Sequence, residues 1–546
     1  MTPPHPILSY EAASWIADLA RPRLVPTTGE HGEYLALSYV WGGDQTHKTT
    51  TTIISTYEQG IAPSLLPATI RDAIYVTHML GFRWLWVDSL CIIQDSDAEK
   101  RHEIGRMHHI YRYAHLTIIA ASAESVCEGF LQDRPPPSQM AFSDYKAGGE
   151  IIIPFICPPT SMRDPDRPLQ VGTVYITPAY SSQSRWPSTA DLGRMGKRAW
   201  CMQEYLMSPR SLVFHSQTLY FRCLTATRSV GESFCSTYEE RRIPNALFRR
   251  DPPVAAPGSK EWIEVYRAWT WIVEDYSSRT ASVESDKLVA CAAVAGQFHA
   301  VLGSEYLAGL WRSDKLLADL LWDIQRGKQE HRHIRPAAYR APSWSWAAVE
   351  GAVRWNFPAW EDDGVVALAE IVECCVTLED AALPFGQVTG GALVLRGTLI
   401  PCRGMRDPRY SEDPEEYQIA LTSLEQARRL KWGLDGGEEE VGSMELEHFA
   451  NATIDCEADE EIGRMWAAPL LREQEWIRGI VLALAASPND SEPAHGKIRC
   501  RRIGTFVSTS LRLLHDTGLE HPLWDPLIRA IKLKCEEFPL VDIVIV

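Results

Sequence analysis

Three residues at helical spacing, Trp200, Gln203 and Glu204, give the sequence its clearest chemical feature. Positions three and four apart share one face of a helix, so the indole, the amide and the carboxylate would point the same way. A carboxylate beside an aromatic ring can have a raised pKa and can hold a sugar hydroxyl. Arg198 and Arg210 flank the segment, and an ion pair between one of them and Glu204 is the structural alternative.

A second group of candidate residues is Ser38, Tyr39 and Trp41, in the stretch Tyr-Leu-Ala-Leu-Ser-Tyr-Val-Trp-Gly that ends at Gly42. The pattern is typical of a strand that ends in a glycine turn, and open α/β folds bind ligands at that end of their strands. Tyr39 and Trp41 could stack on a flat ring, and Ser38 could hydrogen-bond a ribose or a phosphate. Taken alone, the motif favours the structural alternative, in which Trp41 is a core anchor.

The third group follows the apolar stretch Leu85-Trp-Val-Asp-Ser-Leu-Cys-Ile-Ile-Gln-Asp95, which the sequence predicts to be a buried strand and its loop. An aspartate inside such a run is costly unless it is paired or functional. Asp88 could accept ligand hydroxyls or fix the loop through backbone N–H groups, and we favour the second role. Cys91 is more typical of a buried residue than of a nucleophile, because no cation or helix start is evident beside it.

Metal chemistry is not predicted. In helix 99–113, His102 and Glu103 are neighbours in sequence, as are His108 and His109, so we expect the members of each pair to face different directions. We expect this helix to form ion pairs on the surface. None of the 13 cysteines forms a C-x-x-C pair, which argues against a zinc ribbon, and their irregular spacing indicates reduced thiols.

Bulk composition describes a cytoplasmic, core-rich protein of two or three domains. The 546 residues are 45% hydrophobic and include 19 Trp. A formal net charge of −17, without a dense basic cluster, argues against nucleic-acid binding. We see no signal sequence and no apolar run long enough to span a membrane.

The candidate residues sit in an alternation of strands and helices. Strand 34–42, a helix after Pro67, strand 83–93, helix 99–113 and strand 115–121 predict a parallel sheet flanked by helices. Residues 132–190 are rich in Pro, Ser and Gly, and we interpret them as an insertion with short strands at 150–156 and 171–177. Helix 198–207 and strand 211–214 then resume the pattern.

The second half of the chain differs. We predict a Trp-rich helical segment at 255–350 and a β-rich C-terminal domain at 365–546, with strands at 391–400, 480–485, 501–507 and 541–546. The acidic stretches 436–441 and 457–462 are predicted to be a solvated loop.

Along the chain the first motif is 34–42, the second is 85–95 and the third contains Trp200 and Glu204. In this order they resemble the motifs of the fungal heterokaryon-incompatibility (HET) domain, here at about 30–230. Segments at 286–288, 306–311, 320–322 and 341–346 resemble the region that usually follows it. The resemblance implies a role in fungal non-self recognition and programmed cell death, with self-association and an unknown incompatibility partner.

HET domains are in turn similar to Toll/interleukin-receptor (TIR) domains, which have flavodoxin-like folds and in some cases cleave NAD. Leu37-Ser-Tyr39 resembles the TIR opening strand, and Trp200-Cys-x-x-Glu204 resembles the TIR helix that carries the catalytic glutamate. The resemblance implies that Glu204 is catalytic, that NAD is a candidate substrate and that no resident cofactor is needed. Substrate would be bound by Ser38, Tyr39, Trp41, Asp88, Trp200 and Gln203.

Two other hypotheses stay open. NAD hydrolysis requires an accessible Glu204 that faces Tyr39 and Trp41 across a cleft. The motif residues could instead build a self-associating signalling module without catalysis, which predicts that Glu204 is buried against Arg198 or Arg210 and that a surface patch is apolar. Alternatively, the fold could serve a small-molecule enzyme of secondary metabolism, with Cys91 or Asp88 in its site.

Overall fold

The computed structural model forms two compact units, each described separately here: Met1–Gly196 with Met207–Arg242, and Lys197–Leu206 with Ile243–Val546. We call them unit 1 and unit 2. The structure describes residues 7–9, 22–26, 32–43, 45, 47–132, 151–157, 170–176, 192–216, 219–229, 243–281, 283–325, 333–355, 364–405, 417–421, 448–460, 462, 464–473, 476–485, 498–508 and 538–546.

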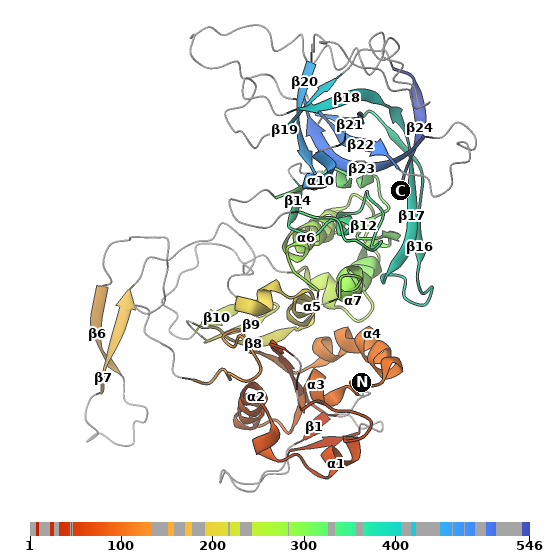
Figure 1. Ribbon diagram of the computed structural model, residues 1–546. Coiled ribbons are helices and arrows are strands. Elements are labelled where there is room, and N and C mark those ends of the chain that lie inside the picture. The colour runs from red at the N-terminus through yellow and green to blue at the C-terminus, as the bar shows by residue number, and fades with distance from the viewer. Residues whose placement is uncertain are drawn as a thin grey trace. The chain divides into compact units, whose positions relative to one another are not determined.

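Unit 1 is built on an eight-stranded mixed sheet in the order β10-β9-β8-β5-β3-β4-β1-β2 (Figure 1). The four central strands, β8, β5, β3 and β4, are parallel, whereas the strands at both edges are antiparallel. The strands are β1 (Ile7–Ser9), β2 (Arg23–Val25), β3 (Tyr34–Ser38), β4 (Trp84–Trp86), β5 (Leu116–Ile119), β8 (Arg210–Phe214), β9 (Leu219–Cys223) and β10 (Thr227–Ser229). The predicted parallel sheet is therefore present, within a larger mixed sheet.

Helices connect the parallel strands. They are α1 (Ile54–Gln59), the short 3-10 helix η1 (Pro63–Leu65), α2 (Ala68–Met79), α3 (Asp88–Cys91) and α4 (Asp97–Tyr113). Helix α2 buries Ile70, Ala73 and Ile74, as the sequence period predicts. Helix α4 is fastened to β3 at two points, because the Tyr34 hydroxyl donates to the Ile110 carbonyl at 2.6 Å and the Tyr111 hydroxyl to the Leu37 carbonyl at 3.0 Å.

The prediction of a single strand over 83–93 is wrong. Strand β4 ends at Trp86, and the backbone N–H groups of Leu90 and Cys91 both donate to the Val87 carbonyl, which starts the helical turn α3. From Leu85 to Ile92 every residue except Asp88 is buried, so neither the sequence nor the burial has a period that separates strand from helix here.

Strands β6 (Ile151–Cys157) and β7 (Gln170–Ile176) form a separate antiparallel pair, close to the two strands predicted inside the insertion. Apart from Gln132 and these two strands, the predicted insertion at 132–190 lies outside the described residues.

Unit 2 begins with part of the 3-10 helix η3 (Gly193–Lys197) and with α5 (Ala199–Met207), which lies in unit 2 except for its last residue. A Trp-rich segment follows. Its elements are η4 (Asn245–Phe248), α6 (Lys260–Ser277), α7 (Asp286–Leu302), β11 (Tyr306–Leu307), β12 (Leu310–Trp311), α8 (Leu316–Asp319), β13 (Trp322–Ile324), η5 (Trp346–Ala348) and β14 (Val353–Trp355).

Indole rings dominate the core of the Trp-rich segment. Trp262, Trp311, Trp322, Trp344 and Trp346 are all fully buried. The Nε1 groups of Trp269 and Trp346 both donate to the Gly309 carbonyl, at 3.1 and 3.0 Å. The segments at 306–311, 320–322 and 341–346 that the sequence analysis noted therefore supply buried tryptophans to this core.

Charged side chains are also used inside the Trp-rich segment. The Lys287 ammonium, 1% exposed, donates to the Ser277 carbonyl at 3.0 Å and pairs with Glu350 at 3.0 Å. Arg340 binds the other oxygen of Glu350 at 2.7 Å. Burial lowers the pKa of Lys287, and the Glu350 carboxylate opposes that shift.

The C-terminal part of unit 2 is a closed barrel of six antiparallel strands with four additional strands (Figure 1). Around the ring run β18 (Ile400–Met405), β19 (Tyr417–Leu421), β20 (His448–Ile454), β23 (Ile498–Val507), β22 (Trp476–Leu484) and β21 (Met465–Glu473), and β21 pairs back with β18. Outside the ring, β15 (Val365–Ala367) pairs with β21, whereas β24 (Leu540–Ile545), β17 (Val388–Thr398) and β16 (Glu370–Leu378) extend from β23. The predicted β-rich C-terminal region is confirmed.

Alternate residues of the barrel strands face a single apolar interior. This barrel core includes Ile400, Cys402, Ile419, Ala450, Met465, Val481, Ala483, Ile503 and Phe506. A six-stranded ring is narrower than the eight-stranded barrels that side chains just fill, so its interior holds side chains and no ligand.

The expectation of a solvated acidic loop at 457–462 is wrong for Asp459. Helix α10 (Glu457–Glu460) buries this residue, where Arg335 binds it at 3.0 Å and Arg501 at 2.6 Å. Asp455 beside it binds Arg335 at 3.2 Å and Arg502 at 3.3 Å. We call these five residues the arginine network. The other acidic stretch, 436–441, lies outside the described residues.

The three-part division at 30–230, 255–350 and 365–546 stays a prediction. Within the described ranges, no helix combines the length and the hydropathy that a membrane crossing requires.

Candidate functional site

The first two motifs meet at the carboxyl ends of two neighbouring parallel strands. Strands β3 and β4 pair in register, with Ala36 beside Trp86, so the loops that follow them emerge side by side. The Trp41 indole Nε1 donates to Asp88 Oδ2 at 2.8 Å. We call this region, Tyr39–Gly43 with Asp88–Asp95, the motif junction.

Tyr39 belongs to the packing of the motif junction. Its side chain is 3% exposed; its hydroxyl donates to Ser89 Oγ at 2.8 Å and accepts from Gln45 Nε2 at 3.2 Å. Burial raises the pKa of Tyr39 well above its usual range, and the nearby Asp88 adds to that shift. The phenol is therefore neutral and held in place, and Ser38, also fully buried, lies in strand β3.

Trp41 and Asp88 differ from their neighbours because both are only half-buried. Asp88 accepts from the Ser89 backbone N–H at 2.6 Å in addition to the indole. This contact fits the expected role of fixing the loop. Trp41 and Asp88 are thus the two sequence candidates at this sheet edge that keep some exposure.

A segment that the sequence analysis did not single out completes the motif junction. The Thr49 N–H donates to the Ser89 carbonyl at 3.0 Å, and the Gln94 N–H donates to the Thr49 carbonyl at 2.8 Å. Thr51 donates twice to Asp95, from its N–H and its hydroxyl, each at 2.8 Å, and these hydrogen bonds lower the pKa of Asp95. Gln45, Thr49, Thr51 and Ser89 were missed because isolated polar residues of these types carry no pattern.

The third motif lies on α5, in unit 2. The helix is attached at its start, where the Ala199 N–H donates to the Thr280 carbonyl at 2.9 Å and the Thr280 N–H to the Lys197 carbonyl at 2.8 Å. Gln203 and Glu204 are buried, at 1% and 6% exposure. Trp200 is half-buried and forms a hydrogen bond with Asp286. Burial raises the pKa of Asp286, and this hydrogen bond opposes that shift.

The structure thus assembles the sequence candidates as two groups. Tyr39, Trp41 and Asp88 are joined in unit 1, and Trp200, Gln203 and Glu204 share one helix of unit 2, as the spacing predicted. Their roles in substrate binding and catalysis stay predictions.

Two buried amide atoms near the candidate residues lack a hydrogen-bond partner among the described residues. They are Gln45 Oε1, beside the motif junction, and Gln203 Nε2, on α5. Most buried polar atoms in proteins are paired, so each of these is a place where a ligand or a water molecule could add a hydrogen bond.

The structure also places Cys91 and the titratable residues of helix α4 that the sequence analysis considered. Cys91 is 2% exposed and its Sγ accepts from the Val87 N–H at 3.4 Å. Glu103, expected on the surface of α4, is buried. The expectation that His108 and His109 face different directions is wrong, because their ring centroids lie 3.9 Å apart. Burial lowers the pKa of His108 to about 4. Across the described residues, no group of three or more His, Cys, Asp or Glu side chains is arranged to hold a metal ion.

Comparison with known proteins supports the interpretation of the motifs. Residues 34–204 match the family model described as heterokaryon incompatibility protein (HET). A curated relative, heterokaryon incompatibility protein 6, OR allele, from Neurospora crassa, is 32% identical over 94 residues. That alignment covers 16% of this chain and 14% of the relative's own length. No solved structure matches the chain.

The family match begins at the first residue of β3 and ends at Glu204, so it includes all three motifs and both groups of candidate residues. Residues 34–204 of this chain are therefore a HET domain.

Proposed function

We propose that this chain acts in fungal heterokaryon incompatibility as an effector of programmed cell death, with residues 34–204 as its active part. The HET match and the relative from Neurospora crassa support this proposal. Net charge of −17 argues against a nucleic-acid partner, so the proposed partners are other proteins and a small substrate.

The activity that we propose is hydrolysis of NAD in the manner of TIR domains. The order of the parallel strands supports it. Across the sheet they lie in the order β4-β3-β5-β8, which is 2-1-3-4 when the four strands are numbered along the chain. The first four strands of flavodoxin-like folds have the same order. Such folds bind ligands at the carboxyl ends of the strands, where the motif junction lies.

In the proposed reaction, water replaces nicotinamide on the ribose, giving ADP-ribose, nicotinamide and a proton. The bond breaks through an oxocarbenium-like state, which a carboxylate stabilises. We assign this role to Glu204, with Gln203 and Trp200 binding substrate from the same helix. At the motif junction Trp41 and Asp88 are the proposed contacts, and Tyr39 and Ser38, being buried, would position them.

One observation carries the proposal furthest, namely that Gln203 Nε2 has no hydrogen-bond partner among the described residues although its side chain is 1% exposed. Glu204 is buried as well, at 6% exposure, and because the signalling module predicts this burial, this single point favours the second candidate function described below. A buried amide donor next to a carboxylate, on the helix that resembles the TIR catalytic helix, suits a ribose with its paired hydroxyls.

The test is nicotinamide release from NAD by the purified full chain, measured over a concentration series. Glu204→Gln keeps the shape of the side chain and should abolish release, whereas Glu264→Gln, an exposed glutamate of α6, should leave it unchanged. Thermal unfolding of each variant confirms that it is folded. Equal release by folded Glu204→Gln and wild type would contradict the assignment of Glu204.

A second candidate function is a non-enzymatic signalling module that acts by self-association. It is favoured by a cluster of exposed apolar residues at the end of α2, Tyr75, Met79 and Leu80, which are 47%, 47% and 44% exposed. Tyr75 and Met79, four apart, lie close together on the helix, and Leu80 follows Met79 directly. Exposed apolar clusters of this kind mark association sites.

Self-association is tested by light scattering over a range of protein concentrations. If this candidate is correct, Met79→Glu should shift the protein to monomers, and Leu540→Glu, at an exposed leucine of unit 2, should not. Absence of NAD turnover at any concentration, together with cell killing by Glu204→Gln equal to wild type, would favour this function over NAD hydrolysis.

A further inference from the structure

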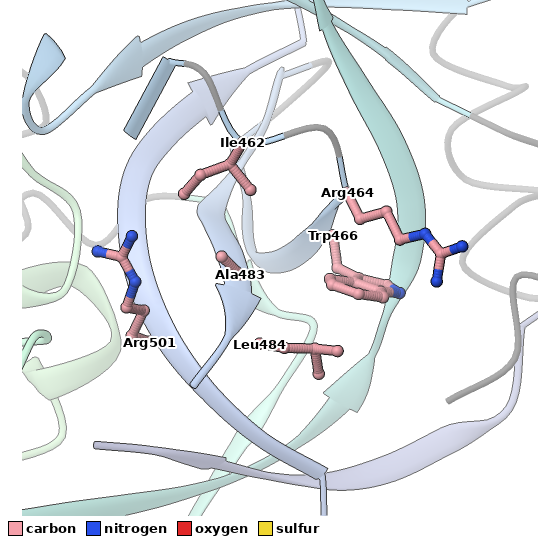
Figure 2. Close-up of a pocket in the computed structure, with 6 residues that line it drawn as sticks. All are labelled: Ile462, Arg464, Trp466, Ala483, Leu484 and Arg501. Carbon is pink, nitrogen blue, oxygen red and sulfur yellow. The ribbon is translucent and has the colours of Figure 1, made fainter. Parts of the chain in front are cut away.

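An open pocket of about 370 Å³ lies at one end of the barrel in unit 2. Its size falls within the range of small-molecule sites. Figure 2 shows the lining, in which apolar side chains stand between two arginines: Ile462, Arg464, Trp466, Ala483, Leu484 and Arg501.

The pocket is the mouth of the barrel. Strand β21 begins at Met465, β22 ends at Leu484 and β23 begins at Ile498. The lining residues therefore lie at the start of β21 or just before it, at the end of β22 and near the start of β23. Ala483 is also part of the barrel core, and Ile462 packs against that core. Since the interior of a six-stranded barrel is filled, the mouth is the place where this fold can receive a ligand.

The walls of the pocket are apolar and partly open. Trp466 is packed at 5% exposure, whereas Leu484 is 46% exposed and Ile462 is half-buried. An indole that packing holds in place offers a rigid surface for a flat ring at a small entropic cost. These walls therefore suit an apolar, preferably aromatic, body.

Both charged side chains in the lining are positive. Arg501 is held in place from behind, because its Nη2 group binds Asp459 Oδ1 at 2.6 Å and Asp459 is itself bound by Arg335 at 3.0 Å. Among the described residues this ion pair engages only the Nη2 group of Arg501, and a guanidinium carries five N–H donors. Arg464 lines the opposite side of the pocket (Figure 2). Guanidinium groups suit carboxylate and phosphate ligands.

We propose that the barrel mouth binds a small molecule that combines an apolar ring with one anionic group, a carboxylate or a phosphate. The ring lies against Trp466 and Leu484, and the anion binds Arg464 at the rim of the pocket, with the positive charge of Arg501 on the opposite side. This site is separate from the HET-domain residues, and the proposal holds whether or not the chain hydrolyses NAD.

The probe for the full chain is 1-anilinonaphthalene-8-sulfonate, a fused aromatic ring that carries one anion, and its fluorescence rises at apolar sites. We expect saturable binding of one equivalent. Arg464→Gln should weaken it about fivefold through loss of a charge-assisted contact. Leu484→Glu should weaken it about tenfold or more, because it places a like charge at the mouth. The uncharged analogue N-phenyl-1-naphthylamine should bind Arg464→Gln and wild type equally.

Matched controls use the same residue types outside the pocket: Arg472→Gln, on the same strand β21, and Leu540→Glu, on β24. Both should bind the probe like wild type, and urea unfolding confirms that each variant is folded. The proposal is overturned by absence of saturable binding to wild type, by unchanged binding to Arg464→Gln and Leu484→Glu, or by equal losses in the two controls. Competition by benzoate or phenyl phosphate then shows whether the natural anion is a carboxylate or a phosphate.

Discussion

The motif junction of unit 1 and the Trp-rich segment of unit 2 use recurrent aromatic residues in opposite ways. At the motif junction the aromatic residues are held by side-chain hydrogen bonds, Tyr39 with Ser89 and Gln45 and Trp41 with Asp88, and Trp41 stays half-buried at a sheet edge. In the Trp-rich segment five indoles are fully buried. A motif is therefore not evidence of a ligand site by itself; what distinguishes the motif junction is exposure at the carboxyl ends of parallel strands.

If this difference is correct, substitutions in the Trp-rich segment and the arginine network should mainly lower the free energy of unfolding, whereas substitutions at the motif junction should cost little stability and mainly change function. The predictions below test this from the largest expected effect to the smallest.

Asp455→Asn should lower the free energy of unfolding of unit 2 by about 3–5 kcal/mol, because it leaves buried guanidinium groups without their carboxylate. Asp455 is 1% exposed and binds both Arg335 and Arg502. Urea unfolding gives the value. The control is Asp542→Asn, which breaks the exposed pair with Arg396 at 3.0 Å and should cost about 1 kcal/mol or less. Equal costs would mean that the arginine network is not a stabilising element.

Gly309→Ala should cost about 2–4 kcal/mol. Gly309 has φ of +105°, and a Cβ there would lie 2.4 Å from Nε1 of the buried Trp346. Gly258→Ala is the matched control, since Gly258 has φ of +76° and no atom within 4 Å of the added Cβ. It should cost about 1 kcal/mol, through backbone conformation alone. Thermal unfolding of the two variants separates the clash from the backbone effect.

Asp319 should make the stability of unit 2 depend on pH. Burial raises its pKa to about 7, and Tyr266 donates a hydrogen bond to its carboxylate. The folded state therefore prefers the neutral acid. This contribution to stability is fully present below about pH 4 and is lost as the pH rises to about 7, by about 1.4 kcal/mol per unit at most.

Asp319→Asn removes that titration. Between pH 5 and pH 8 the variant should lose less free energy of unfolding than wild type, and urea titrations at the two pH values measure the difference. Parallel pH profiles for the two proteins would show that Asp319 keeps an ordinary pKa in the folded state.

Asp88→Asn should have the smallest effect on stability, about 1 kcal/mol. The single oxygen of asparagine can accept from the Trp41 indole, but its amide nitrogen cannot accept from the Ser89 N–H, so the variant loses one hydrogen bond and the charge. Its effect on nicotinamide release or on cell killing should exceed its effect on stability. The matched control is Asp97→Asn, at an exposed aspartate outside the motif junction, which should change neither readout. A stability loss comparable to that of Asp455→Asn would mean that Asp88 is a structural residue like those of unit 2.

Several elements could be predicted because the pattern that forms them is local. Helix α2 has a clear apolar period between Pro67 and Gly81, and α5 carries Trp200, Gln203 and Glu204 on one turn. The helix α3 was missed because a run of Trp, Val, Leu and Ile fits a strand and a buried helix equally well over so few residues.

The candidate site was predictable only in part. Trp41 and Asp88 could be singled out by type and position, but Gln45, which binds Tyr39, and Thr49, which binds Ser89 and Gln94, lie in a segment without a pattern. The burial of Asp459 was missed for the same reason, since an acidic run appears solvated until Arg335 and Arg501, distant in sequence, are found beside it.

The sequence by itself determined the three HET motifs, the parallel α/β core, the β-rich C-terminal region and the shared face of Trp200 and Glu204, because each depends on residues close together along the chain. Only the tertiary structure decided which of these polar and aromatic side chains are buried, that six strands close into a barrel, and that Arg464, Trp466 and Arg501 meet at its mouth. Strand pairing and ion pairing join residues far apart in sequence, and their free energy depends on burial that no local pattern records.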